Sequence, residues 1–130
     1  QLQSMASSTK AAATSSKARP SDQELVATYN GTRQDLQALA NKAGELERDA
    51  DEHKLVIQTL EETMQSDPER KCFRMIDSVL VERTVKEVLP ALKTTLEKLV
   101  ETMQGIANAY SEKEREQNEF VKKWNIQIKN

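Results

Sequence analysis

Few residues of this chain belong to the types that carry out chemistry. Cys72 and His53 are its single cysteine and single histidine, so the chain offers neither an internal disulfide nor a His/Cys set for a metal ion. Neither a second cysteine nor a histidine lies near Cys72 in the sequence, which favours a structural role over a redox or nucleophilic one. His53 falls within a helical apolar pattern, where a packed polar residue is commoner than a pH sensor. We predict no catalytic residue and no metal site.

Two charged groups also have a chemical and a structural interpretation. Acidic residues gather at Glu45, Glu47, Asp49, Asp51 and Glu52. They lack the glycine and the spacing of a calcium loop, which predicts a solvated helix face. Lys122 and Lys123 either steer acidic partners or complement the dipole at a helix end, and both interpretations stay open. Without a phosphate-binding glycine loop or an activated nucleophile, we expect no enzyme activity and no cofactor.

Composition indicates long elements with few turns. The 130 residues include three glycines, three prolines and 4% aromatic residues, fewer than a compact domain of this size normally uses. The apolar runs are too short for a membrane span or a secretory leader, so we predict no membrane partner. Nineteen basic and 21 acidic residues nearly balance, which argues against nucleic-acid binding. The single cysteine favours a reducing intracellular compartment.

The N-terminal residues differ from the rest of the chain. Residues 1–20 are rich in Ala, Ser and Thr and hold too little apolar surface to offset the entropy of ordering, which predicts a disordered tail. Residues 1–4 are open to interpretation as an expression remnant before a natural start at Met5. The sequence S-D-Q-E from Ser21 to Glu24 is a capping box, which predicts that a helix begins there. This first helix, residues 21–66, is expected to end before Pro68.

Two long segments each have twelve positions at alternating spacings of four and three, of which ten are apolar, the heptad pattern of a coiled coil. The first seam is Leu25, Tyr29, Thr32, Leu36, Leu39, Ala43, Leu46, Ala50, His53, Ile57, Leu60 and Met64. The second seam is Val85, Leu89, Leu92, Leu96, Leu99, Met103, Ile106, Tyr110, Lys113, Gln117, Phe120 and Trp124. A second helix over residues 85–130 follows. Pro90 leaves two alternatives open for this helix. Either its regular part begins near Leu89, or the helix begins earlier and is kinked at the proline.

Residues 67–84, between the helices, predict a β-hairpin with Asp77-Ser78 as its turn. This turn places Ile76 opposite Val79, and its type stays open because serine tolerates positive φ less readily than aspartate. Both faces of the hairpin would then carry apolar groups, which other copies or other subunits must cover. The predicted oligomer interface comprises Phe73, Met75, Ile76, Val79, Leu80 and Val81.

The short hairpin segment requires the two helices to fold back antiparallel, so that Tyr29 lies near Phe120 to Trp124. A two-helix end has no third layer to bury its apolar groups fully, which predicts a binding surface. Spacing alone favours seam packing for Phe120 and Trp124, although one ring can serve both purposes. The residues of this surface, here called the tip set, are Leu25, Val26, Tyr29, Phe120, Trp124, Ile126 and Ile128.

The segment CFRMIDSVLVERTVKEVLPAL, residues 72–92, resembles the prefoldin family and, within it, the β-class subunits. Its strongest match is VLVERTVKEVLP, residues 79–90, and EHKLVIQTL, residues 52–60, resembles the first helix of the same subunits. The resemblance covers about residues 22–128 and is specific, because a generic coiled coil would not share a hairpin sequence between two equal heptad arms. Family members often have glycine in the turn, where this chain has Asp77-Ser78.

The resemblance implies an ATP-independent holdase chaperone whose subunits form a hexamer of two α-class and four β-class chains. This mainly α chain, an antiparallel two-helix coiled coil joined by one β-hairpin, would be one β-class subunit, and the hairpins would assemble into an oligomeric β-barrel. Its partners would be two α-class and three further β-class subunits. The tip set would bind unfolded actin and tubulin for delivery to the cytosolic group II chaperonin.

The compartment implied by this role is the cytoplasm, and nuclear residence stays open. The alternative is a structural coiled-coil scaffold or tether without chaperone activity. Such a scaffold predicts a homodimer and does not explain an apolar hairpin.

Overall fold

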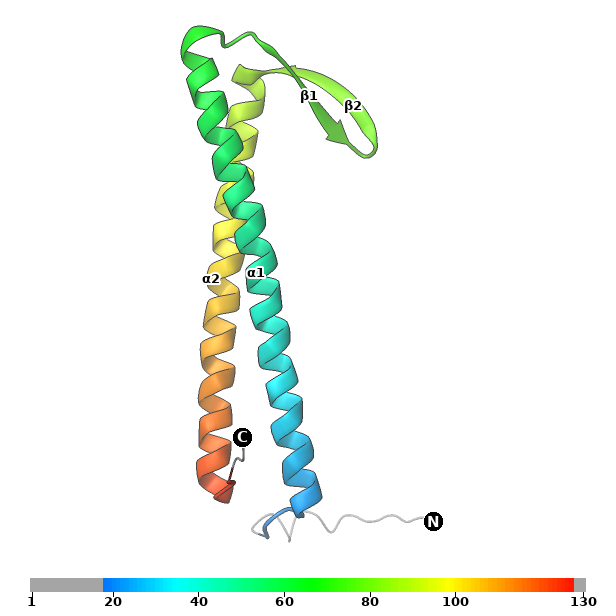
Figure 1. The fold of residues 1–130 in the computed structure, drawn as a ribbon, viewed down its shortest axis with the longest axis vertical. Coiled ribbons are helices and arrows are strands. Elements are labelled where there is room, and N and C mark those ends of the chain that lie inside the picture. Colours follow the sequence, from blue (N-terminus) through cyan, green and yellow to red (C-terminus); the bar gives the residue numbers. More distant parts are fainter. Residues whose placement is uncertain (1–17, 128–130) are drawn as a thin grey trace. The chain divides into compact units, whose positions relative to one another are not determined.

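The computed structural model describes residues 18–127. Four elements follow one another along the chain: α1 (Asp22–Ser66), β1 (Lys71–Ile76), β2 (Val79–Thr84) and α2 (Val85–Trp124), as Figure 1 shows. Two long helices joined by one antiparallel hairpin are the predicted fold class, which the structure confirms. Assembly of the hairpin into a barrel stays a prediction. The part of the predicted tail at residues 1–17 lies outside the described residues.

The chain forms two compact units, and both helices contribute to each. The hairpin unit is Gln37–Glu112, and the terminal unit combines the residues up to Leu36 with those from Lys113 onward. In the hairpin unit, the Lys93 ammonium of α2 lies 2.9 Å from the Glu61 carboxylate of α1. In the terminal unit, Lys113 lies 3.3 Å from Asp35. Within each unit, therefore, an α1 segment lies against an α2 segment.

The heptad prediction is confirmed by burial. All twelve positions of each predicted seam are buried or half-buried, and most other helix positions are exposed. The core of the hairpin unit consists of Leu46, Ala50 and Ile57 from α1 with Val85, Val88 and Leu89 from α2. Neither helix has, among residues 18–127, an apolar stretch long enough to cross a bilayer.

A second capping box, which the sequence analysis missed, explains where α2 begins. Glu87 accepts a hydrogen bond of 3.0 Å from the Thr84 backbone N–H, and the Glu87 N–H donates to the Thr84 hydroxyl at 3.3 Å. The next two N–H groups also find acceptors: Val85 donates to the Arg70 carbonyl at 2.9 Å and Lys86 to the Pro68 carbonyl at 3.0 Å. The helix therefore begins at Val85 and includes Pro90, so a start near Leu89 is wrong.

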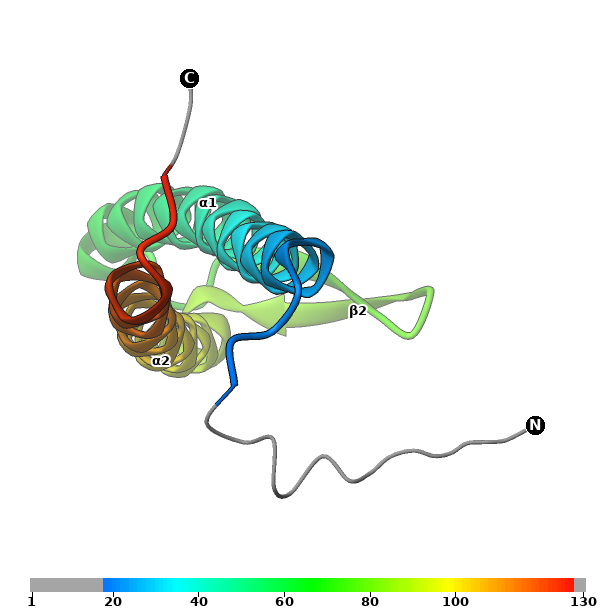
Figure 2. The ribbon, with the colours of Figure 1, turned by 90° about the horizontal axis from the view of Figure 1, so that it is seen from below.

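The hairpin has the predicted register. Ile76 pairs with Val79, and the ladder continues to Lys71 opposite Thr84. Asp77 and Ser78 have φ values of 47° and 67°, and this pair of positive angles identifies the two-residue turn as type I′. Figures 1 and 2 both show the hairpin extending away from the helices that it joins. Both of its faces consequently stay open in the single chain.

Candidate functional site

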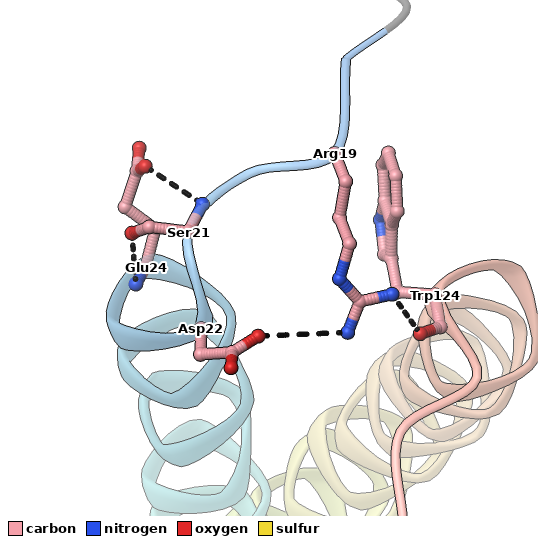
Figure 3. A network of polar contacts seen from close by, with 5 residues as sticks. All are labelled: Arg19, Ser21, Asp22, Glu24 and Trp124. Atoms are coloured by element: carbon pink, nitrogen blue, oxygen red, sulfur yellow. Dashed lines mark hydrogen bonds and ion pairs between the residues drawn. The ribbon is translucent and has the colours of Figure 1, made fainter.

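The start of α1, in the terminal unit, is held by the predicted capping box. The Ser21 N–H donates to the Glu24 carboxylate at 3.1 Å, and the Glu24 N–H donates to the Ser21 hydroxyl at 3.1 Å, as Figure 3 shows. The backbone N–H of Ser21, and then its hydroxyl, hold the pKa of Glu24 below its ordinary value. Reciprocal bonds satisfy N–H groups that a helix start otherwise leaves without partners.

The end of α2, in the same unit, has a C-terminal cap. Asn125 adopts a left-handed φ of 52°. Its N–H donates to the Lys122 carbonyl at 3.3 Å, and the Ile126 N–H donates to the Val121 carbonyl at 3.0 Å. This pair of bonds is the Schellman motif, in which asparagine is the commonest substitute for glycine. The motif turns the chain so that Ile126 is half-buried.

Arg19 connects these two helix ends. Its Nη1 donates to the Trp124 carbonyl at 2.6 Å, and its Nη2 lies 3.7 Å from the Asp22 carboxylate, as Figure 3 shows. The guanidinium thereby places positive charge at the negative end of the α2 dipole. Arg19 falls within the segment predicted as a disordered tail, and no role was predicted for it. No local pattern could have found this contact, because its partners are 105 residues apart.

A hollow of about 500 Å³ opens in the terminal unit beside these contacts. Its apolar lining comes from Leu25, Val26 and Tyr29 of α1 and from Ile126 beyond α2. Its polar lining comes from Arg19, Asp22, Asn30, Arg33, Asn125 and Gln127. The hollow can accept an apolar side chain and offers amides and charges to the groups beside it.

The tip set contributes unequally to the exposed surface. Val26 has 57% of its surface exposed, whereas Leu25 has only 4%. The expectation that this end cannot bury its apolar groups fully is therefore wrong for Leu25, because the two helix ends and their caps enclose it. Ile128 lies outside the described residues. The remaining members of the set, Tyr29, Phe120, Trp124 and Ile126, are half-buried.

The heptad seam of the terminal unit also contains a buried side-chain amide. Gln117 is 8% exposed, and its Nε2 donates to the Tyr29 carbonyl at 3.2 Å. Its Oε1 is buried without a hydrogen-bond partner in the described part of the chain. The predicted neighbour of Tyr29 was Phe120 to Trp124, so the observed contact lies about one turn earlier on α2.

The second candidate surface is the hairpin. Of the six predicted interface residues, Val81 is half-buried and the other five are exposed by 41% to 65%. Phe73, Met75 and Leu80 are among the most exposed large apolar residues that the structure describes. Exposed apolar surface of this extent is typical of an interaction site, so the geometry leaves this hairpin available to partners.

The residues with possible chemistry are not brought together. His53 Nδ1 lies 2.9 Å from the Asp49 carbonyl, and Cys72 is a half-buried free thiol in β1. Across residues 18–127 no three His, Cys, Asp or Glu side chains are grouped as a metal ion would need. Lys123 lies 4.9 Å from the centre of the Trp124 ring, within the range of a cation–π contact.

Comparison with known proteins agrees with this architecture. Residues 23–130 match the family model described as prefoldin subunit. Over 112 residues the chain is 45% identical to prefoldin subunit 2 of Homo sapiens, which covers 86% of this chain and 71% of that protein. Over 111 residues it is 47% identical to probable prefoldin subunit 2 of Schizosaccharomyces pombe, covering 85% and 95%. Identity to prefoldin subunit 2 of Arabidopsis thaliana is 38% over 109 residues, covering 84% and 72%.

Proposed function

Because the chain belongs to the prefoldin family, we propose that it captures unfolded proteins without ATP and delivers them to a chaperonin. The family is one of non-enzymatic co-chaperone subunits, and membership implies assembly with other prefoldin subunits. One observation carries the proposal: the terminal unit holds a partly apolar hollow with Val26 open to solvent. A surface of this kind suits weak, reversible contacts with exposed apolar segments of many sequences.

The proposed assembly is a hexamer of two α-class and four β-class subunits, of which this chain is one β-class member. The exposed apolar residues of β1 and β2 support this role, because a two-stranded hairpin is marginal in water without cover. Neighbouring hairpins would pair with its open edges and bury Phe73, Met75 and Leu80 in a β-barrel. Several terminal units in one particle would then hold a client together, so that weak contacts add by avidity.

The proposed clients are unfolded actin and tubulin, and the proposed recipient is the cytosolic group II chaperonin. The proposed compartment is the cytoplasm, with nuclear residence as a further possibility. The half-buried rings of Tyr29, Phe120 and Trp124 would contribute to client contact through their outer faces.

Assembly is tested by replacing Leu80, which is 61% exposed, with aspartate. Leu80→Asp places a charge where the barrel would exclude water, at a cost of several kcal/mol. We expect co-expression with the five partner subunits to yield a hexamer for the unchanged chain and none for this variant, by native mass spectrometry. Leu55→Asp is the matched control, since Leu55 is 66% exposed on α1 and should not affect assembly. A stable homodimer indifferent to the partners and to Leu80→Asp would favour the scaffold alternative.

Client capture is tested with the pair Val26→Ser and Val100→Ser, which change valines of 57% and 50% exposure. Light scattering by actin diluted from denaturant measures how well the assembled hexamer suppresses aggregation. We expect Val26→Ser to weaken suppression by up to about tenfold, the value of one buried valine contact, with part of the loss masked by the other subunits. Val100→Ser should leave suppression unchanged. Equal effects of the two variants would argue against the terminal unit as the client site.

A further inference from the structure

The hollow of the terminal unit carries positive charge. Two of its lining residues, Arg19 and Arg33, are basic and one, Asp22, is acidic. Arg19 already lies 3.7 Å from the Asp22 carboxylate, so this pair largely neutralises itself. Arg33 is exposed, and within residues 18–127 its side chain takes part in no ion pair or side-chain hydrogen bond. One guanidinium at the edge of the hollow is therefore available to a partner.

The apolar and charged parts of the hollow follow one face of α1. Val26, Tyr29 and Arg33 occupy positions i, i+3 and i+7, which lie in line on a helix. At a rise of 1.5 Å per residue, Val26 and Arg33 are about 10 Å apart along the axis. An extended peptide advances about 3.3 Å per residue, so the same distance corresponds to about three residues of a bound segment.

The hollow also offers groups that suit a peptide backbone. Asn30 lies between Tyr29 and Arg33 on this face, and Asn125 and Gln127 line the hollow from the other side. Each side-chain amide has both donor and acceptor atoms, so it can bond to a peptide N–H or C=O whatever the bound sequence. The Arg33 guanidinium, in contrast, discriminates between bound sequences, because its fork of N–H donors fits a carboxylate.

From this arrangement we infer that the hollow selects extended client segments in which a large apolar side chain is followed or preceded, about three residues away, by an Asp or Glu. The apolar side chain would lie against Val26 and Tyr29, and the carboxylate would pair with Arg33. The inference rests on the proposed function, since it names the class of segment that the same surface captures. It differs from capture by hydrophobicity alone, which takes no account of acidic neighbours.

The direct test measures binding of fluorescein-labelled 12-residue peptides to the assembled hexamer by anisotropy. The probe has a Gly/Ser background with one leucine and, three residues later, one glutamate. The comparison peptides carry glutamine in place of glutamate, or carry the glutamate directly beside the leucine. We expect the probe to bind about two- to fivefold tighter than either, the range of an exposed ion pair. This preference should fade at about 0.5 M salt because of screening.

Variants assign the preference to one residue. Arg33→Gln should remove the preference for glutamate over glutamine, and Arg33→Glu should reverse it in favour of a lysine-containing peptide. Arg48→Gln is the matched control, because Arg48 is also exposed on α1 but does not line the hollow. The preference should survive that change. Equal binding of the glutamate and glutamine peptides, or a preference that Arg33→Glu leaves intact, would overturn the inference.

Two further outcomes concern other occupants and the proposed function. A preference that appears only after residues 1–17 are removed would assign the hollow to that segment of the chain and overturn the inference. Actin aggregation, measured in parallel, separates the two proposals. Suppression of aggregation without a glutamate preference would remove the inference and leave the proposed function. A glutamate preference without suppression would remove the proposed function and leave an acidic-peptide site.

Discussion

The two glutamates that close the capping boxes of α1 and α2 accept their hydrogen bonds as charged carboxylates. Glu24 accepts from the backbone of Ser21, and Glu87 accepts from the backbone and the hydroxyl of Thr84. The Thr84 N–H, and then its hydroxyl, hold the pKa of Glu87 below its ordinary value, as Ser21 does for Glu24. Ionised carboxylates make the stronger acceptors, and each also lies at the positive end of a helix dipole.

The lowered pKa values predict a pH dependence of stability. Because the folded pKa of each glutamate lies below its unfolded value, the stabilisation is complete above about pH 5 and is lost as the pH falls through the folded pKa. Thermal unfolding followed by circular dichroism should therefore show a falling melting temperature between pH 6 and pH 3. The fall should be smaller in the Glu24→Gln, Glu87→Gln double variant, because glutamine accepts the same bonds without titrating.

Glu97→Gln is the control for this experiment, since Glu97 is an exposed residue within α2 and outside both capping boxes. It should leave the slope of melting temperature against pH nearly unchanged. If the double variant and the control gave the same slope, titration elsewhere in the chain would dominate and the capping glutamates would not be the cause.

The turn residues are the other residue-scale feature, because neither is the glycine that their φ angles favour. A left-handed φ costs a residue other than glycine roughly 1 kcal/mol or more, with aspartate less affected than serine. We expect Ser78→Gly to raise the free energy of unfolding by about 1 kcal/mol, measured by urea denaturation. Ser111→Gly is the matched control within α2, where the same change should lower stability by up to about 1 kcal/mol. A destabilising Ser78→Gly would contradict the type I′ assignment.

At the scale of the elements, the two seams combine apolar packing with one buried amide. A polar residue in a coiled-coil seam sets the register of the helices and reduces stability. Gln117 fits this description, because it donates to the Tyr29 carbonyl at 3.2 Å while its Oε1 has no partner in the described residues. The amide therefore favours one alignment of α2 against α1 within the terminal unit.

Replacing this amide should separate stability from register. We expect Gln117→Leu to raise the free energy of unfolding by about 1 kcal/mol, because an unsatisfied buried acceptor is removed. The same change should make the chain less uniform, seen as additional oligomers in size-exclusion chromatography with light scattering. Gln58→Leu, at an exposed position of α1, should alter stability by less than about 0.5 kcal/mol. A destabilised Gln117→Leu with a single oligomeric state would show that the amide serves stability and not register.

Local patterns account for the elements that the sequence predicts correctly. Heptad spacing identified both seams, and S-D-Q-E identified the start of α1. The pairing of Ile76 with Val79 followed from a two-residue turn. The start of α2 also has a local signal, since Thr84 to Glu87 reads T-V-K-E, a capping box. It was not predicted because Pro90 favoured a later start.

At the scale of the whole molecule, features that depend on distant residues could not be predicted. Arg19 bonds to Trp124 across 105 residues, and no spacing rule connects them. The hollow beside this contact requires both helix ends and the cap at Asn125, so its shape was not visible from the sequence. Burial of Leu25 has the same origin. Charge and apolarity of single residues pointed to this end of the chain as a candidate binding surface without indicating how its side chains divide between core and surface.

At the same scale, residues 18–127 leave many large apolar side chains exposed. Five large apolar side chains of one short hairpin are open to solvent, whereas the buried core that the structure describes contains only seven apolar residues. Such a balance is expected of a subunit whose cover comes from partners. Stability of this chain should therefore be measured in the assembled complex as well as alone.

The contacts of the terminal unit have a consequence for the order of folding. The bonds from Val85 and Lys86 to the Pro68–Arg70 segment close short loops, whereas the bonds of Gln117 and Arg19 span 88 and 105 residues. Closing a longer loop costs more chain entropy. The two helices should therefore pack against each other first next to the hairpin and last at the chain ends. Thermal opening should run in the reverse direction. Leu25, which is buried in the folded chain, should then be among the first core residues that local unfolding exposes to solvent.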